Sequence, residues 1–180
     1  DVNDDGFDDV LVGAFRADPN AVTSGLGENE ESGSSYVVFG KSGGFAAAVN
    51  LDSLDGTNGF RLDGEGPLDF SGIAVSSAAD VNGDGFDDLL VGAHYAYRGG
   101  FPGSDSLSGS SYLVFGKAHG FAATLALADL DGAAGFRMEA SAAAGTGREV
   151  SAAGDVNGDG FGDMLIGAPY AFSGQSFSED

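Results

Sequence analysis

Short apolar runs of four or five residues alternate with segments rich in Gly, Asp and Ser along the whole chain. Runs such as VLVG and YVVF contain β-branched and aromatic residues, which favour strands, and Gly and Asp bound them as turn residues do. Sustained 3.6-residue periodicity is absent, so a helical protein is not expected. In two Ala-rich runs, 45–54 and 121–130, we expect a turn or two of helix.

The same short sequence motifs recur in the same order along the chain, which indicates internal repeats. DVNDDGFDDVLVGA (1–14) returns with few changes at 80–93 and 155–168, and GSSYVVFGK (33–41) returns at 109–117. LDGTNGFRLD (54–63) returns as LDGAAGFRME (130–139). Each unit is about 76 residues long, the offset between Tyr36 and Tyr112. In the most complete unit we expect four strands, at 72–76, 88–92, 112–115 and 135–138.

Four short strands in each repeat are typical of a propeller blade, so we predict an all-β fold of four-stranded antiparallel β-propeller blades. The chain would hold about 2.4 such units. Residues 1–59 form a partial first blade, and 60–134 hold its fourth strand and three strands of the second. Residues 135–180 hold the last strand of the second blade and two strands of a third. Because propellers close with typically 4–8 blades, we expect further blades of the same protein or other copies to complete the ring.

Charge and composition exclude several classes of protein. The chain has 28 acidic and 7 basic residues, a formal net charge of −21, so it lacks the cations that a nucleic acid or an anionic membrane would require. It has no Cys for disulfides or thiolate sites. No apolar run approaches the roughly 20 residues of a membrane span, so we expect no direct insertion. The start at Asp1, without an initiator Met, is expected for a mature or excised piece.

The recurring motif D-x-N-x-D-G-x-x-D carries the candidate chemistry. Side chains at positions 1, 3 and 5, the carbonyl at position 7 and the Asp at position 9 offer oxygen ligands, which suit Ca²⁺ better than Mg²⁺. Up to three ions are predicted. Their ligands are Asp1, Asn3, Asp5, the Phe7 carbonyl and Asp9; Asp80, Asn82, Asp84, the Phe86 carbonyl and Asp88; and Asp155, Asn157, Asp159, the Phe161 carbonyl and Asp163.

The Asp-rich motif has two alternative interpretations. An EF-hand loop needs a Glu at position 12, where this chain has Val12, Val91 and Ile166, and strand-like sequence follows. A metal-free Asp/Gly turn is the other alternative. Against it, three carboxylates within nine residues repel one another unless a cation lies among them, and every proposed ligand is identical in the three copies.

These motifs resemble the FG-GAP repeat, which builds the β-propeller of integrin α subunits and of many bacterial surface or secreted proteins. The resemblance rests on the Asp-rich loop, the following VLVGA-like strand and YVVFG, and it covers nearly the whole chain. It implies that the calcium loop joins the first two strands of a blade. Loops on the opposite face, between the second and third strands and between blades, would recognise a ligand. The long repeat, and a GAP tripeptide complete only at 167–169, place the chain nearer the bacterial proteins.

Aromatic residues and one arginine gather in the loop after the second strand of the central unit. Tyr95, Tyr97, Arg98 and Phe101 are candidates for binding a protein or carbohydrate ligand, because aromatic side chains and Arg dominate such contacts. The alternative is that these side chains cover the edges of the blades.

Together these features predict a calcium-binding, integrin-like propeller segment of an extracellular or cell-surface protein, acting as a binding or adhesion module. No catalytic residues are predicted: His94 and His119 do not recur between units, and no G-x-S-x-G motif occurs. Gly40-Lys41-Ser42 lacks the first glycine of a phosphate-binding loop. A propeller within a secreted lyase- or phospholipase-like enzyme, or a structural array component, are the alternatives.

Overall fold

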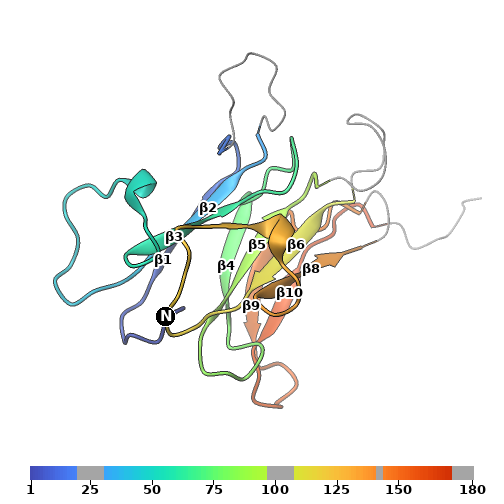
Figure 1. The fold of residues 1–180 in the computed structure, drawn as a ribbon. Coiled ribbons are helices and arrows are strands. Elements are labelled where there is room, and N and C mark those ends of the chain that lie inside the picture. The colour runs from blue at the N-terminus through green and yellow to red at the C-terminus, as the bar shows by residue number, and fades with distance from the viewer. Residues whose placement is uncertain (20–30, 97–107, 141–143, 172–180) are drawn as a thin grey trace, which may run out of the picture.

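The computed structural model describes residues 1–19, 31–96, 108–140 and 144–171, and it is built from sheets that lie side by side (Figure 1). The first sheet has the order β1 (Val10–Ala14), β2 (Ser34–Val38), β3 (Gly59–Asp63), β7 (Thr124–Ala126). The second has the order β4 (Ala74–Ala79), β5 (Asp88–Ala93), β6 (Ser110–Val114), β8 (Gly135–Glu139). The third pairs β9 (Val150–Gly154) with β10 (Asp163–Ile166).

The predicted all-β class is confirmed. The second sheet holds the four strands expected of one repeat, and each pairs antiparallel with its neighbour. Its first strand begins at Ala74 rather than at residue 72, because Gly72 adopts φ +84°, which an extended strand does not allow. In the described ranges only single 3₁₀ turns are helical, and none is long and apolar enough to cross a membrane.

The core lies between the stacked sheets, because the strands of the second sheet bury both of their faces. Successive side chains of a strand point to opposite faces. Leu89 and Val91 of β5 belong to the cluster shared with the first sheet, whereas Leu90 between them belongs to the cluster shared with the third. This two-sided burial explains why these strands are apolar runs without polar alternation.

The two Ala-rich runs differ from the sequence prediction. Residues 121–130 form the strand β7 and one 3₁₀ turn, η2 (Leu127–Asp129), while 45–54 contain only the turn η1 (Leu51–Ser53). Helices this short are marginal in water even when Ala-rich. The exposed edge of β3 supplies backbone partners instead: the Arg61 N–H donates to the Ala123 carbonyl at 2.9 Å, and β7 pairs with β3 in parallel.

One buried hydroxyl ties the second sheet to the segment that precedes it. Tyr112 is 1% exposed, and its hydroxyl donates to Glu65 Oε2 at 3.0 Å. The Arg137 guanidinium donates to the same oxygen at 2.6 Å. Burial is the main cause that raises the pKa of Tyr112, and the nearby Glu65 and Asp69 carboxylates raise it further. The hydroxyl therefore remains a neutral donor.

We expect Tyr112→Phe to lower the free energy of unfolding by about 1–2 kcal/mol, because a hydrogen bond to a charged acceptor is lost while the ring still fills its site. Tyr36 occupies the equivalent position in β2 and is only half-buried. Tyr36→Phe is the matched control, with an expected change within about 0.5 kcal/mol. Urea unfolding of both variants measures the difference, and equal losses would contradict the role of the Glu65 contact.

Candidate metal centre

The three Asp-rich loops lie at the same end of the three sheets, the lower end in Figure 1. Residues 80–88 lead from β4 into β5, residues 155–163 lead from β9 into β10, and residues 1–9 precede β1. In the second and third sheets the motif therefore forms the turn between the first two strands of the repeat. This is the position that the resemblance implies.

The first Asp of each motif organises the loop through backbone N–H groups. In the central loop, Asp80 Oδ1 accepts from the N–H of Gly83 at 2.7 Å and of Asp84 at 3.1 Å, and Oδ2 accepts from Gly85 at 2.9 Å. Asp155 makes the same three contacts in the third loop, at 2.7, 3.1 and 2.8 Å. The N–H donors hold the pKa of Asp155 below its usual value, that of Gly160 most strongly.

The side chains at positions 3 and 5 close two smaller turns. Asn82 Oδ1 accepts from the Asp84 N–H at 2.9 Å, and Asp84 Oδ1 accepts from the Phe86 N–H at 3.0 Å. The Asn82 amide also donates to Asp84 Oδ2 at 2.8 Å. The equivalent Asn3 amide donates to Asp5 at 3.1 Å. The side chains at positions 3 and 5 are thus hydrogen-bonded to each other in the central and first loops.

The last Asp of the motif anchors the loop to its own sheet. Asp88 Oδ2 accepts from the Val81 N–H at 2.9 Å, and Oδ1 accepts from the Gly116 N–H at 3.0 Å. Asp9 repeats both contacts, with Val2 and Gly40, at 2.8 Å each. The Asp88 side chain is fully buried. Burial raises the pKa of Asp88, and the Asp84 and Asp80 carboxylates raise it further, although the two N–H donors act in the opposite direction.

The glycine after the third strand belongs to this site, and sequence reasoning missed it. A Cβ on Gly116 would lie 2.5 Å from the Asp87 carbonyl oxygen and 2.7 Å from Phe86 Cβ. A Cβ on Gly40 would meet the equivalent atoms of the first loop at 2.5 and 2.6 Å. The signal was present in the sequence, since FGK recurs in both units. Its glycine lets the strand end approach the Asp-rich loop and donate to the closing carboxylate.

The loops offer the right donors for a hard cation, but their side chains are turned to other partners. Within the ranges that the structure describes, no group of three or more Asp, Glu, His or Cys side chains converges as a metal site would. The carboxylates accept backbone N–H bonds instead. The donor set still fits Ca²⁺ in its chemistry, because it is all oxygen and includes three carboxylates, of which Asp88 is buried. Binding would require Asn82 and Asp84 to exchange their mutual bond for the ion.

The predicted ligand-binding residues lie partly outside the described residues: Tyr97, Arg98 and Phe101 do so. Tyr95 follows β5, at the end opposite the Asp-rich loop, and it is 38% exposed. Its ring packs edge-on against Phe70 at 5.2 Å and against His94 at 4.1 Å. Phe70, which sequence reasoning did not single out, also contacts Phe15 of the first unit at 6.1 Å. Aromatic side chains of two units therefore meet at this end.

Comparison with known proteins gives a family and relatives. The FG-GAP repeat family matches residues 71–113 and 146–178. Integrin alpha-PS5 of Drosophila melanogaster is 29% identical over 95% of this chain, and integrin alpha-3 of Cricetulus griseus is 26% identical over 93%. Phosphatidylinositol-glycan-specific phospholipase D of Bos taurus is 30% identical over 97% of this chain. The chain spans 14% of the length of each integrin and 18% of the phospholipase. The chain therefore contains FG-GAP repeats at 71–113 and 146–178, and it is similar to integrin α subunits over nearly its whole length.

Proposed function

We propose that the Asp-rich loops bind Ca²⁺ and that the ions stabilise the fold rather than take part in catalysis. The buried Asp88 carboxylate carries this proposal. Burial raises its pKa most, and the nearby Asp84 and Asp80 carboxylates raise it further. Repulsion among these three acids disfavours the folded chain, and a cation among them would remove it. Bound Ca²⁺ would supply the positive charge that offsets this repulsion.

In the proposed site, some residues would supply oxygen ligands and others orient those ligands through backbone N–H groups. Asp80, Asn82, Asp84, the Phe86 carbonyl and Asp88 would supply its oxygen ligands in the central loop. The backbone N–H groups of Val81 and Gly116 orient Asp88, and those of Gly83 and Gly85 orient Asp80. Each of these carboxylate oxygens retains lone-pair capacity for a metal, because an ionised carboxylate has about four acceptor sites. The first and third loops would hold ions in the same way.

A calcium titration of variants in the Asp-rich loops tests the proposal. We expect Asp84→Ala to weaken one site by roughly tenfold or more, because ligand charge and number tune affinity in such loops. Asp8→Ala is the matched control: it removes the same charge from the exposed, variable position 8 of the first loop, and it should leave the central site in place. Isothermal titration calorimetry measures both. Equal isotherms for the two variants would contradict the ligand assignment.

The second part of the proposal is that the chain is a binding module of an extracellular or cell-surface protein. Its similarity to integrin α subunits supports this role. Loops of this kind in extracellular modules bind calcium at roughly 10⁻⁴–10⁻³ M, which suits millimolar calcium outside cells. The aromatic end around Phe70 and Tyr95 is the candidate surface for a protein or carbohydrate ligand. Neighbouring blades would be its other partners.

The alternative function is that of a propeller within a secreted enzyme, because a phospholipase D is among the relatives. The described residues favour a binding role for this segment. His94 is half-buried against Phe70, and burial, followed by the Arg148 charge, lowers its pKa. No carboxylate is within ion-pair distance of that imidazole in the described part of the chain. Hydrolysis assays on glycolipid and polysaccharide substrates discriminate the two roles.

A further inference from the structure

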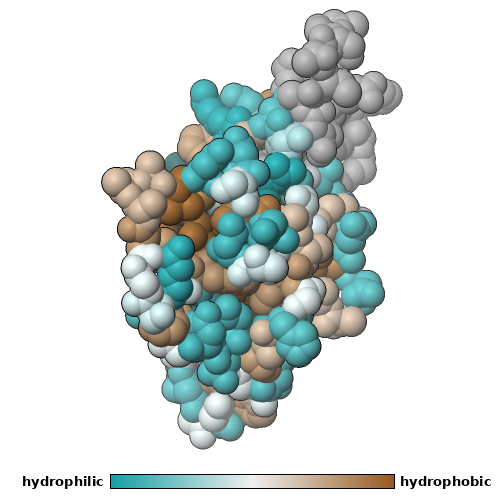
Figure 2. Space-filling view, turned by 60° about the vertical axis from the view of Figure 1, so that its left-hand side comes forward, coloured by the Kyte–Doolittle hydropathy of each residue, from teal (hydrophilic) through white to brown (hydrophobic). Residues whose placement is uncertain are grey.

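The second and third Asp-rich loops each contain an asparagine that is followed directly by a glycine. These pairs are Asn82-Gly83 and Asn157-Gly158, and all four residues are exposed. A glycine after an asparagine leaves the backbone nitrogen open to approach the side-chain amide, because it has no side chain to obstruct the way. Hydrophilic residues are open to solvent at the lower end of the molecule in Figure 2, the end where the Asp-rich loops lie. Water therefore has access to both pairs.

The backbone nitrogen of each of these glycines is bonded to a carboxylate. The Gly83 N–H donates to Asp80 Oδ1 at 2.7 Å, and the Gly158 N–H donates to Asp155 Oδ1 at 2.7 Å. Both glycines have a φ of +77°, in the left-handed region that glycine adopts without strain. A carboxylate within hydrogen-bond reach of a nucleophile's proton is the arrangement of a general base. Each loop therefore holds an acceptor for the proton that this nitrogen must lose when it attacks a carbonyl carbon.

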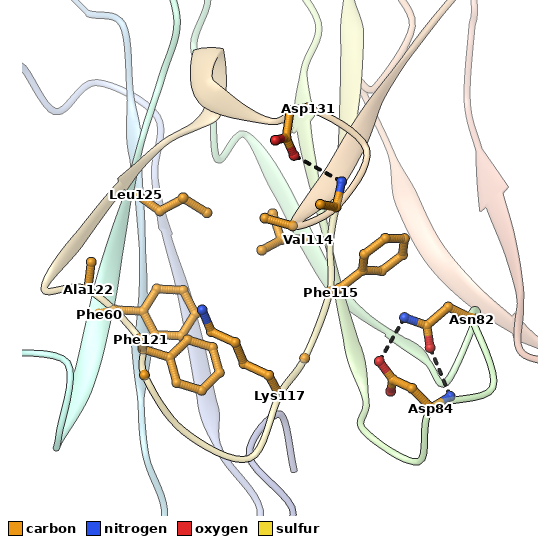
Figure 3. A pocket seen from close by; sticks show the side chains of 14 residues that line it. Phe60, Asn82, Asp84, Val114, Phe115, Lys117, Phe121, Ala122, Leu125 and Asp131 are labelled. Atoms are coloured by element: carbon orange, nitrogen blue, oxygen red, sulfur yellow. Dashed lines mark hydrogen bonds between the residues drawn. The ribbon is translucent and has the colours of Figure 1, made fainter.

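The Asn82 side chain is folded back over the same peptide group. Its Oδ1 accepts from the N–H of Asp84, two residues onward, at 2.9 Å, as in an Asx turn. That N–H is placed to stabilise the negative charge that develops on Oδ1 when Cγ is attacked. The amide nitrogen, which would be the leaving group, donates to Asp84 Oδ2 at 2.8 Å. Figure 3 shows both bonds between Asn82 and Asp84. In the third loop Asn157 Oδ1 accepts the equivalent bond at 2.9 Å.

We propose that Asn82 and Asn157 are sites of self-catalysed deamidation. In the central loop the Gly83 nitrogen forms a bond to Asn82 Cγ, and its proton passes to Asp80 Oδ1. The Cγ–Nδ2 bond then breaks, the departing nitrogen takes a proton from water and leaves as ammonia, and Asp80 returns its proton to the solvent. The product is a five-membered succinimide ring. Water adds to either carbonyl carbon of the ring and opens it, which gives aspartate or isoaspartate.

Two other asparagines of the chain lack this arrangement. Asn3 of the first loop is followed by Asp4, whose side chain obstructs the approach, and among the described residues no carboxylate accepts from the Asp4 N–H. Asn58 is followed by Gly59, but that glycine begins β3 and is buried. Asn58 Oδ1 also accepts from the N–H of Asp55, on its N-terminal side, at 3.0 Å. Both asparagines should therefore persist longer than those of the second and third loops.

Deamidation would change the loop in which it occurs. The Asn82 amide donates to Asp84, whereas a carboxylate at this position accepts only, so an attraction becomes a repulsion between two anions. Isoaspartate also lengthens the main chain by one carbon atom inside a tight turn. In the proposed function this residue is a calcium ligand, so its conversion would alter that site as well. The deamidation itself requires only the loop as it stands without an ion.

Ageing of the full chain in EGTA, followed by peptide mapping with mass spectrometry, measures the conversion of each asparagine. We expect Asn82 to convert at least about tenfold faster in the folded chain than in a synthetic peptide of residues 78–90, because positioned acid–base groups accelerate reactions by about 10²–10⁴-fold in enzymes. The peptide has the same sequence without the folded loop. Asn58 should convert more slowly in the chain than in a peptide of residues 54–63. Because no calcium is present, this result is separate from the fate of the metal proposal.

Reciprocal substitutions in the two loops test the role of the carboxylates. Asp80→Asn should slow the conversion of Asn82 roughly tenfold and leave that of Asn157 unchanged, whereas Asp155→Asn should do the reverse. In each variant the unchanged asparagine reports that the chain is folded. If a variant unfolds the chain, the proposal requires both rates to fall to those of the peptides.

Two results would overturn the proposal. One is an Asn82 that converts more slowly in the folded chain than in its peptide, since the loop would then protect the asparagine. The other is an Asp80→Asn chain in which Asn82 converts at the rate of the unsubstituted chain, since the carboxylate would then have no part in the reaction.

Discussion

Removing calcium with EGTA is expected to lower the thermal unfolding midpoint of the chain by about 8–30 °C relative to 10 mM Ca²⁺. A site with a dissociation constant of roughly 10⁻⁴–10⁻³ M contributes about 1.4–2.7 kcal/mol at that concentration, because the ion binds the folded loop and not the unfolded chain. Three sites contribute together. A domain of this size shifts by about 2–4 °C for each kcal/mol. Differential scanning calorimetry gives the midpoints directly.

Salt is the essential control for this measurement. The formal charge of −21 means that any electrolyte stabilises the chain by screening repulsion. NaCl at matched ionic strength gives the unspecific part, and 10 mM Mg²⁺ tests selectivity, because Mg²⁺ demands a tighter octahedral site and sheds water reluctantly. Only the part of the midpoint increase that Ca²⁺ produces beyond NaCl and Mg²⁺ is attributed to binding at the loops. Midpoints that coincide in Ca²⁺ and in matched NaCl would show that the loops hold no structural ion.

Gly92→Ala is the single substitution expected to have the largest effect on how the sheets stack. Gly92 belongs to the GA pair that ends β5, and a Cβ there would lie 2.0 Å from the Gly147 carbonyl oxygen, just before β9. A Cβ on Gly13 would likewise lie 2.2 Å from the Gly72 carbonyl oxygen. Backbone cannot move aside as a flexible side chain does. We expect a loss of about 3 kcal/mol, the upper part of the range for overpacking.

The chain contains a matched control for this substitution. Gly167 occupies the same place in the third unit, and a Cβ there would meet nothing closer than 3.4 Å in the described residues. Neither glycine has a positive φ, so alanine adds no backbone strain at either position. Gly167→Ala should change the free energy of unfolding by less than about 0.5 kcal/mol. Equal losses for the two variants in urea unfolding would mean that close approach of the sheets does not explain the recurring glycine.

The repeated unit and its strands could be predicted because the signals are local. Apolar runs bounded by Gly and Asp mark β5, β6 and β8 within two residues of their observed bounds. The Asp-rich loop was equally accessible, since its ligand types and spacing are properties of nine consecutive residues. The hydrogen bonds within that loop follow from the same spacing: Asn82 and Asp84 each accept from the N–H two residues onward.

Contacts between units could not be predicted in this way. β7 is a strand because β3 offers it an edge, and no local preference of Thr124–Ala126 reveals that edge. The buried state of Asp88 depends on Gly116, which is 28 residues further along the chain. Phe70 joins Tyr95 at the opposite end through packing of separate loops. Each of these features needs the sheets to be stacked before it exists.

A crystal structure of the chain grown with 10 mM CaCl₂ tests the central claim most directly. The account predicts an ion in the central loop, ligated by Asp80, Asn82, Asp84, the Phe86 carbonyl and Asp88 at about 2.3–2.6 Å. The bond between the Asn82 amide and Asp84, 2.8 Å long here, should then be broken. A loop that keeps this bond in saturating calcium, with no ion among its carboxylates, would contradict the account.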